Sequence, residues 1–293
     1  MKVWKAIMSV WLEGYIMNKL LASNFSRLWK NKVFWIGTAI LFLWSTLMLI
    51  SGHHAALAEP EYPRFLDDFF FQYGPVMGIF GAVFTSLFLG TDYSDGTIRN
   101  KIMIGHSRQS IYLSNLIVSA AAGIIMNAAW ILSMLTVGIS LFGWFTSSVT
   151  TILMYQFIAV IMIAAFASIF TLITMLNQNK ASSAVITLLS FLVLLFLASY
   201  CNNRLNEPEM YSSAAVITSN GLELADPTQN PDYIRGSMRK LFEFFVEFLP
   251  TGQGILMSSM EAVHLWLMPL YSLLVITLTT IAGVFCFRRK DLK

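Results

Sequence analysis

The polar and charged residues that could bind a partner or take part in a reaction are concentrated in one stretch, 90–110, which lies between two long apolar runs. It carries both signs of charge, which suits docking to another molecule. Catalysis would need a nucleophile with its base, a cluster of metal ligands or a phosphate-binding loop, and the stretch supplies none of them. The candidate residues are Asp92, Tyr93, Ser94, Asp95, Gly96, Thr97, Ile98, Arg99, Asn100, Lys101, Gly105, His106, Ser107 and Arg108.

Two further places hold titratable pairs. His53 and His54 are adjacent and can bind a metal, but we prefer a solvated pair on an exterior loop. Glu261 and His264 are three residues apart, and no HExxH or GxSxG motif accompanies them. We therefore expect no catalytic, metal-binding or cofactor-binding residues, and a protein that is not an enzyme.

Composition sets the class of protein. Of 293 residues, 56% are hydrophobic and 12% are charged, against about 25% charged in soluble domains. The chain is expected to be an integral membrane protein. A net charge of +3 is too small and too dispersed for nucleic-acid binding. The two cysteines, Cys201 and Cys286, are expected near opposite membrane faces, where they cannot pair.

Apolar runs predict an all-α fold with six transmembrane helices. The third run has 33 residues at ~1.5 Å each, so it must tilt or project from a hydrocarbon core ~30 Å thick. The expected spans are 33–51, 73–90, 111–143, 152–176, 183–201 and 265–287.

Basic residues orient the spans, because cytoplasmic loops are enriched in Lys and Arg. Fourteen of the nineteen fall on one side: six before the first span, three in 90–110, Lys180, and four at the C-terminal end. Both termini and 90–110 are thus expected in the cytoplasm, with 52–72 and 202–264 outside, in a multi-pass protein of the cell membrane.

Short helices are expected at both membrane surfaces. Residues 17–31 place apolar and basic side chains on opposite faces, which suits a helix lying on the membrane. Outside, an apolar stripe predicts a helix from Ile234 that ends at Pro250, with Glu243 and Glu247 on its polar face. A turn at 251–254 then leads to a second short helix, 255–260. These two helices are either re-entrant or bound to the surface.

The N-terminal extension, 1–16, precedes a single six-span transmembrane domain, 17–293. It is either a short interfacial helix or a stretch upstream of a start at Met17.

The second span carries two surfaces suited to helix packing. Gly74, Gly78 and Gly81 share one face, and an aromatic ridge lies on another; either can meet a second subunit. The ridge consists of Phe80, Phe84 and Phe88. No Asp, Glu, Lys, Arg or His falls inside the six spans, and this disfavours an ion-coupled carrier.

Local signals place a helix of about two turns in the polar stretch. Ser94 or Asp95 can cap its start, Gly105 can follow its end, and Ser107 or Ser110 can cap the third span. The alternative is an ordinary cytoplasmic loop.

The segments DYSDGTIRNK (92–101) and GHSR (105–108) resemble the cytoplasmic loop of ATP-binding-cassette (ABC) permeases of the type-two exporter class, which are common in Gram-positive bacteria. MNKLL (17–21) and RLWKNKVFW (27–35) are similar to that family's entry helix and first span. LPTGQ (249–253) resembles its external re-entrant element, and FRRKDLK (287–293) its usual ending.

The resemblance implies a coupling helix in 90–110 that sits in a cleft of a separate ATPase, where ATP and Mg bind. The chain itself has no GxxxxGK[ST] motif. A second permease chain, identical or homologous, and membrane lipids are the other implied partners. The first, second and fifth spans would switch the pathway for a peptide, lipid or amphipathic drug. The alternative function is a non-transporting membrane scaffold or sensor that uses 202–264.

Overall fold

The computed structural model describes residues 17–211, 215–218, 221–224 and 227–291, so the predictions for 1–16 lie outside it. Six helical segments of the described residues are long and apolar enough to cross a membrane, which confirms a helical multi-pass architecture. They are α2 (Lys32–Ala58), α3 with α4 (Asp67–Phe70, Tyr73–Ser94), α6 to α7 (Arg108–Ser133, Ile139–Phe142), α8 (Val149–Leu176), α9 (Lys180–Leu205) and α12 (Leu267–Arg289).

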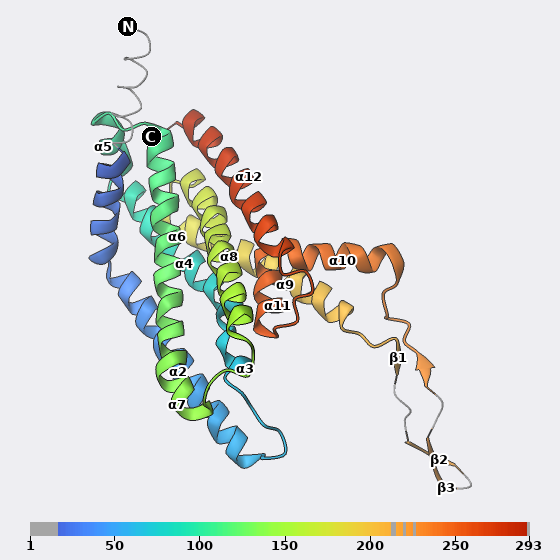
Figure 1. Ribbon diagram of the computed structural model, residues 1–293. Coiled ribbons are helices and arrows are strands. Elements are labelled where there is room, and N and C mark those ends of the chain that lie inside the picture. The colour runs from blue at the N-terminus through green and yellow to red at the C-terminus, as the bar shows by residue number, and fades with distance from the viewer. Residues whose placement is uncertain (1–16, 212–214, 219–220, 225–226, 292–293) are drawn as a thin grey trace.

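Helices α4 and α8 form the centre of the bundle. Helix α8 packs against α12, α4 and α6, while α4 also packs against α9, and α2 covers α6 (Figure 1). The windows of α2, α9 and α12 that could cross a membrane are the least buried. These three helices therefore present apolar surface outward, as lipid or another apolar partner requires.

Two glycines of the α4 glycine face, Gly74 and Gly78, pack against other helices of the same chain, so they do not supply the contact with a second subunit that the sequence allowed. A Cβ on Gly74 would lie 2.5 Å from the carbonyl oxygen of Gly254, and one on Gly78 would lie 2.0 Å from the ring of Phe191. Both glycines are thus needed for close approach of neighbouring helices.

The aromatic ridge is also largely internal. Phe84 and Phe88 are buried and stack on each other, with ring centroids 5.1 Å apart. Phe84 also meets Phe34 of α2 edge to face. The ridge therefore joins α4 to α2, and it is not a surface left for a second subunit.

The third span is continuous but not uniform. A π-helical turn (η1, Met134–Gly138) joins α6 to α7. The whole run, Arg108–Phe142, has 35 residues. At ~1.5 Å per residue it exceeds a ~30 Å hydrocarbon core by about 20 Å.

Helix α2 is longer than predicted. It continues to Ala58, so His53 and His54 lie on a helix and not on a loop. The His53 ring meets Phe142 of α7 edge to face. Among the described residues, no group of three or more His, Cys, Asp or Glu side chains could hold a metal.

The segment before the last span contains helices α10 (Gly236–Phe248) and α11 (Pro250–Ser258). Pro250 does end the first of these helices, but it also occupies the first turn of the second, where its missing N–H costs nothing. The predicted turn at 251–254 is therefore wrong: these residues are helical. Helix α10 runs across the direction of α6 and α12 (Figure 1).

Helix α11 is held by its polar side chains. The Nε2 atom of Gln253 donates to the carbonyls of Glu247 and Met268, 2.8 and 2.9 Å away. Its Oε1 atom accepts from Ser272 at 2.7 Å. Thr251 donates to the Leu194 carbonyl of α9. Because these side chains are buried, each satisfied bond favours this single arrangement of the helices.

Two small antiparallel sheets precede α10 and were not predicted. Strand β1 (Met210–Tyr211) pairs with β4 (Thr228–Gln229), and β2 (Ala215–Thr218) pairs with β3 (Gly221–Leu224). They extend away from the helices in Figure 1. The fold is thus helical with a small β appendage.

Candidate functional site

The predicted short helix is present as α5 (Thr97–Met103), although its start differs from the prediction. Its N-cap is Gly96, which has a left-handed φ of 66°, so neither Ser94 nor Asp95 caps it. Its end is as predicted: Gly105 has φ 101°, and the His106 N–H donates to the Lys101 carbonyl at 3.0 Å. This pattern closes a helix C-terminus through a glycine.

Ser107 then caps α6, since its side chain accepts from the Ser110 N–H. Arg108 has a structural task that the sequence did not suggest. Its Nη1 atom donates to the carbonyls of Phe287, Arg288 and Lys290 at the end of α12. The positive guanidinium satisfies carbonyls that a helix end leaves free, and it ties the first turn of α6 to the last turn of α12.

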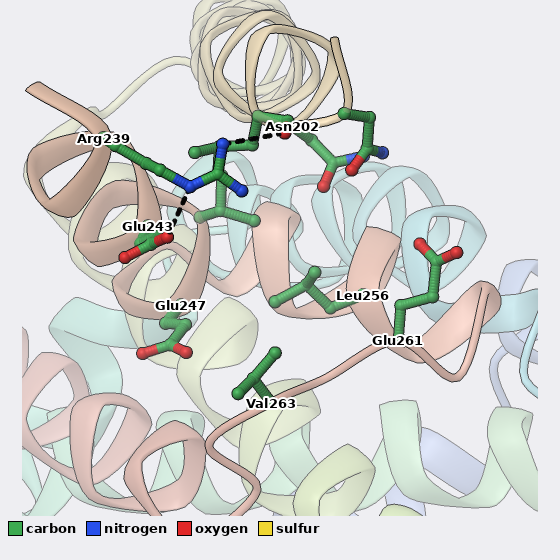
Figure 2. Close-up of a pocket in the computed structure, with 10 residues that line it drawn as sticks. Asn202, Arg239, Glu243, Glu247, Leu256, Glu261 and Val263 are labelled. Atoms are coloured by element: carbon green, nitrogen blue, oxygen red, sulfur yellow. Dashed lines mark hydrogen bonds and ion pairs between the residues drawn. The ribbon is translucent and has the colours of Figure 1, made fainter. Parts of the chain in front are cut away.

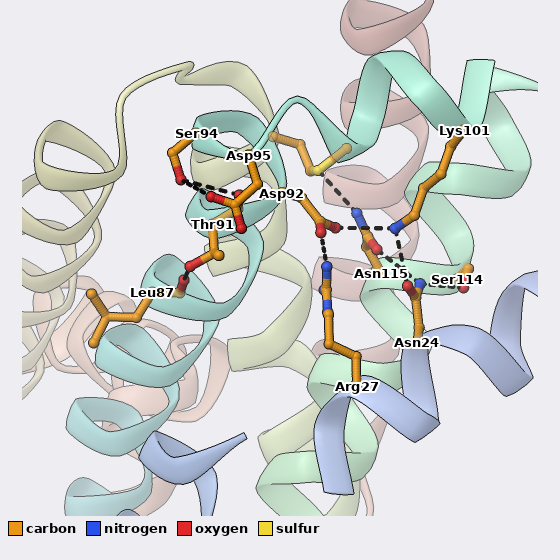
Figure 3. Close-up of polar contacts among 11 residues, drawn as sticks. Asn24, Arg27, Leu87, Thr91, Asp92, Ser94, Asp95, Lys101, Ser114 and Asn115 are labelled. Atoms are coloured by element: carbon orange, nitrogen blue, oxygen red, sulfur yellow. Dashed lines mark hydrogen bonds and ion pairs between the residues drawn. The ribbon is translucent and has the colours of Figure 1, made fainter. Parts of the chain in front are cut away.

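A buried ion-pair cluster lies under α5 (Figure 3). Asp92, near the end of α4, is 1% exposed and pairs with Arg27 and Lys101. The Lys101 ammonium lies 3.1 Å from the Asp92 carboxylate. Arg27 comes from the helix formed by residues 17–29, and its guanidinium also lies over the Phe88 ring, 3.9 Å from the centroid. One carboxylate thus joins three helices.

Asn24 extends this cluster to α6. Its Oδ1 atom accepts from Lys101 at 3.0 Å, and its Nδ2 atom donates to Ser114 and Asn115 at 2.7 and 3.0 Å. Asn24, Ser114 and Asn115 are all buried. Helix 17–29, α4, α5 and α6 therefore meet in one polar network with little access to water.

The electrostatics of this network are unbalanced. Arg27 and Lys101 pair directly with the same carboxylate, Asp92, so each cation lowers the share of that negative charge left for the other. Burial, together with the charge of Arg27, lowers the pKa of Lys101 to about 7. Burial lowers the pKa of Arg27 to about 10, partly offset by the negative charge of Asp95. Both shifts follow from removing a cation from water.

The opposite face of α5 is exposed. Arg99 and Asn100 point away from the bundle, and Met103 and Ile104 are 77% and 79% exposed. An apolar pair this exposed, at the end of a charged loop, is typical of a contact surface when it adjoins other exposed groups. Helix α5 therefore has an inner face that bonds to neighbouring helices and an outer face that is exposed in the described part of the chain.

The predicted residues divide between these two roles. Ser94, Asp95, Arg99, Asn100, Gly105 and Ser107 are exposed; Asp92, Ile98 and Lys101 are buried; Tyr93, Gly96, Thr97, His106 and Arg108 are intermediate. The buried charges are internal contacts, not docking residues. Tyr93 likewise bonds inward, to the Met175 carbonyl of α8.

Several participants were missed in the sequence. Met103 and Ile104 could have been noticed as an apolar pair inside a charged loop. Asn24 and Ser114 carry no signal of their own, because only the tertiary fold brings them to Lys101.

Comparison with protein-family models and with curated proteins finds no match.

Proposed function

We propose that the chain is the membrane-spanning permease subunit of an ATP-driven exporter of the ABC type-two class, with both termini in the cytoplasm. The observation that supports this most is the two-sided build of α5. Its inner face is fixed by Lys101 to Asp92 of α4 and to Asn24 of helix 17–29, while Met103 and Ile104 are free to contact a partner.

In this proposal α5 is a coupling helix and its partner is a separate ATPase that binds ATP and Mg. A displacement of the exposed tip would be carried to α4 through Asp92, to α6 through Asn24, and to α2 through helix 17–29. The network suits this task because packed elements joined by buried polar bonds move together and do not deform separately.

Helix 17–29 would lie in the inner membrane surface. Trp29 and Trp35 are about half exposed, and the Trp35 indole N–H donates to the Trp29 carbonyl at 2.8 Å. Tryptophan pairs of this kind favour the boundary between headgroups and acyl chains. Membrane lipids are thus a proposed partner of this helix.

A second permease chain, identical or homologous, would complete the pathway. Helix α9 supports this with an outward apolar groove lined by Leu189, Leu192, Val193 and Phe196. An apolar route of this kind suits a peptide, a lipid or an amphipathic drug as the exported compound.

Reconstituted transport tests the proposal. ATP should drive vectorial movement of a labelled amphipathic compound by the chain and its ATPase, and an ionophore should leave that movement intact. Arg99→Glu combined with Asp95→Lys should abolish coupling without affecting membrane insertion, because both side chains are exposed. Normal transport by this double variant would refute the role of α5.

An alternative is a non-transporting scaffold or sensor, supported by a pocket of about 130 Å³ between α9 and α10 that Asn202, Glu243 and Glu247 help to line (Figure 2). It predicts ligand binding at the external segment and no ATP-dependent movement of any compound.

A further inference from the structure

A second pocket lies at the end of α4 that adjoins α5, where α4 meets the start of α9. Its volume is about 490 Å³, and most small-molecule sites measure about 300–1,000 Å³. Leu87 and Ser94 line one side, on the face of α4 turned away from Asp92 (Figure 3). Residues 178–181, the turn and the first residues of α9, line the other. The pocket is therefore separate from the ion-pair cluster under α5.

Lys180 is the cation of this pocket. A Cβ on Gly90 would lie 3.0 Å from both the Cα and the Cγ atoms of Lys180, so the lysine stem rests directly on the backbone of α4. The Lys180 side chain is exposed, and its ammonium makes no hydrogen bond or ion pair with any described residue. Packing thus holds the stem in place while the positive head stays available to an anion.

The start of α9 itself is already occupied. The Asn179 side chain accepts from the N–H groups of Ala181 and Ser182 at 2.8 and 3.2 Å. The binding group is therefore the Lys180 side chain and not the end of the helix. Gln178 is fixed at the rim, because its Nε2 atom donates to the Asp291 carbonyl at 2.8 Å.

The surroundings of the pocket are mainly basic. Residues 288–290, Arg-Arg-Lys, end α12 beside it, and Lys290 donates to the Met175 carbonyl just before the turn. The neighbouring acids are Asp291 and Asp95, and Asp95 accepts from the Ser94 hydroxyl at 3.2 Å. An anion therefore approaches most favourably from the side of Lys180 and residues 288–290.

An apolar stripe leads away from the pocket along α4. Ile79, Val83 and Leu87 follow one another at intervals of four residues, so they share one face of the helix. Ile79 and Val83 are each 39% exposed, although α4 is among the more buried spans. Leu87 belongs both to the stripe and to the pocket. A charged site thus continues into an apolar surface, as the two ends of an amphiphile require.

We propose that this pocket binds the head group of an anionic phospholipid, with the phosphate at Lys180 and one acyl chain along Val83 and Ile79. Basic pockets between spans on the cytoplasmic side suit anionic lipid head groups. A water-soluble phosphate would use only the polar half of this surface. The binding needs neither an ATPase nor ATP, so its test is independent of the proposed export.

The test is native mass spectrometry of the full chain, purified in a neutral detergent and titrated with palmitoyl-oleoyl phosphatidylglycerol. One molecule should bind with a Kd at least about fivefold lower than that of phosphatidylcholine with the same chains, the factor expected for one basic residue at a membrane surface. Glycerophosphate at about 10 mM should not displace the lipid, because it lacks the acyl chains. Equal Kd values for the two lipids, or displacement by glycerophosphate, would overturn the proposal.

Variants locate the site. Lys180→Gln should remove the preference for phosphatidylglycerol, whereas Lys180→Arg keeps the charge and should retain it. Lys30→Gln makes the same change at another exposed lysine, distant from the pocket in sequence, and should also retain the preference. Because Lys180 is exposed and has no bond to a described residue, its substitution should leave the fold intact. A preference that survives in Lys180→Gln, is lost in Lys180→Arg, or falls equally in Lys30→Gln would contradict the assignment.

Discussion

Asp92→Asn should be the most damaging single polar substitution in the cluster under α5. Among the described residues, the change removes the carboxylate that both Arg27 and Lys101 pair with, and it leaves the buried Lys101 ammonium beside the partly buried Arg27 guanidinium. Breaking a buried ion pair by removing one partner costs about 3–5 kcal/mol. We expect a loss of that size in the free energy of unfolding. The amide keeps the shape of the carboxylate, so the effect reports charge and not packing.

Two matched variants make the prediction specific. Lys101→Met leaves Arg27 and Asp92 balanced and removes the repulsion between the cations. We expect this variant to lose about 1–3 kcal/mol in the free energy of unfolding, because the buried Oδ1 atom of Asn24 loses the Lys101 ammonium as its donor. Asp95→Asn changes an exposed carboxylate and should stay within about 0.5 kcal/mol. The assay is unfolding by SDS titration from mixed micelles, followed by tryptophan fluorescence. A Lys101→Met loss equal to or larger than that of Asp92→Asn would refute the charge argument.

Other predictions concern the same region and the helix contacts. The pKa of Lys101 lies near 7 in the fold and near 10.5 in the unfolded chain, so the unfolded state binds more protons between these values. The free energy of unfolding of the wild type should therefore rise from pH 7 to pH 10 relative to Lys101→Met, measured by the same titration. A relative fall would show that burial does not dominate the pKa of Lys101. Gly74→Ala should cost about 1–3 kcal/mol because its Cβ would meet backbone, whereas Gly81→Ala meets a ring at an ordinary 3.4 Å and should cost far less. Equal losses in the two variants would contradict the packing described for α4. Arg108→Met should free the end of α12 and lower stability by about 1–2 kcal/mol, while Arg99→Met, which is exposed, should change it little. Faster proteolysis at the C-terminal end in the first variant alone would agree with this.

The six spans were predictable because each is a local property. About twenty consecutive apolar residues specify a membrane helix without reference to the rest of the chain. Gly105 and Ser107 were predictable for the same reason, since helix ends depend on the conformation and side chain of one or two residues. The start of α5 was missed because Gly96 competes with two good capping residues and ends α4 by a left-handed turn.

The network under α5 could not be predicted from local pattern. Arg27 and Asp92 are far apart in the sequence, and nothing in their spacing joins them. The burial of Glu247 was also hidden, because the helical pattern fixes which residues share a face but not which face meets the protein. The helical state of 251–254 was missed because two glycines suggest a turn until Gly254 is seen packed against Gly74.

The most direct test of the central claim is a cross-link from the tip of α5. Cys201 is buried and Cys286 is exposed, so Cys286→Ser provides the background. Ile104→Cys, cross-linked in native membranes, should capture a separate polypeptide with a GxxxxGK[ST] motif, and ATP should change the yield. Leu57→Cys, which is also exposed and lies near the end of α2, should not capture it. If residue 104 captures no nucleotide-binding polypeptide, or if both positions capture the same one, the proposed role of α5 is wrong.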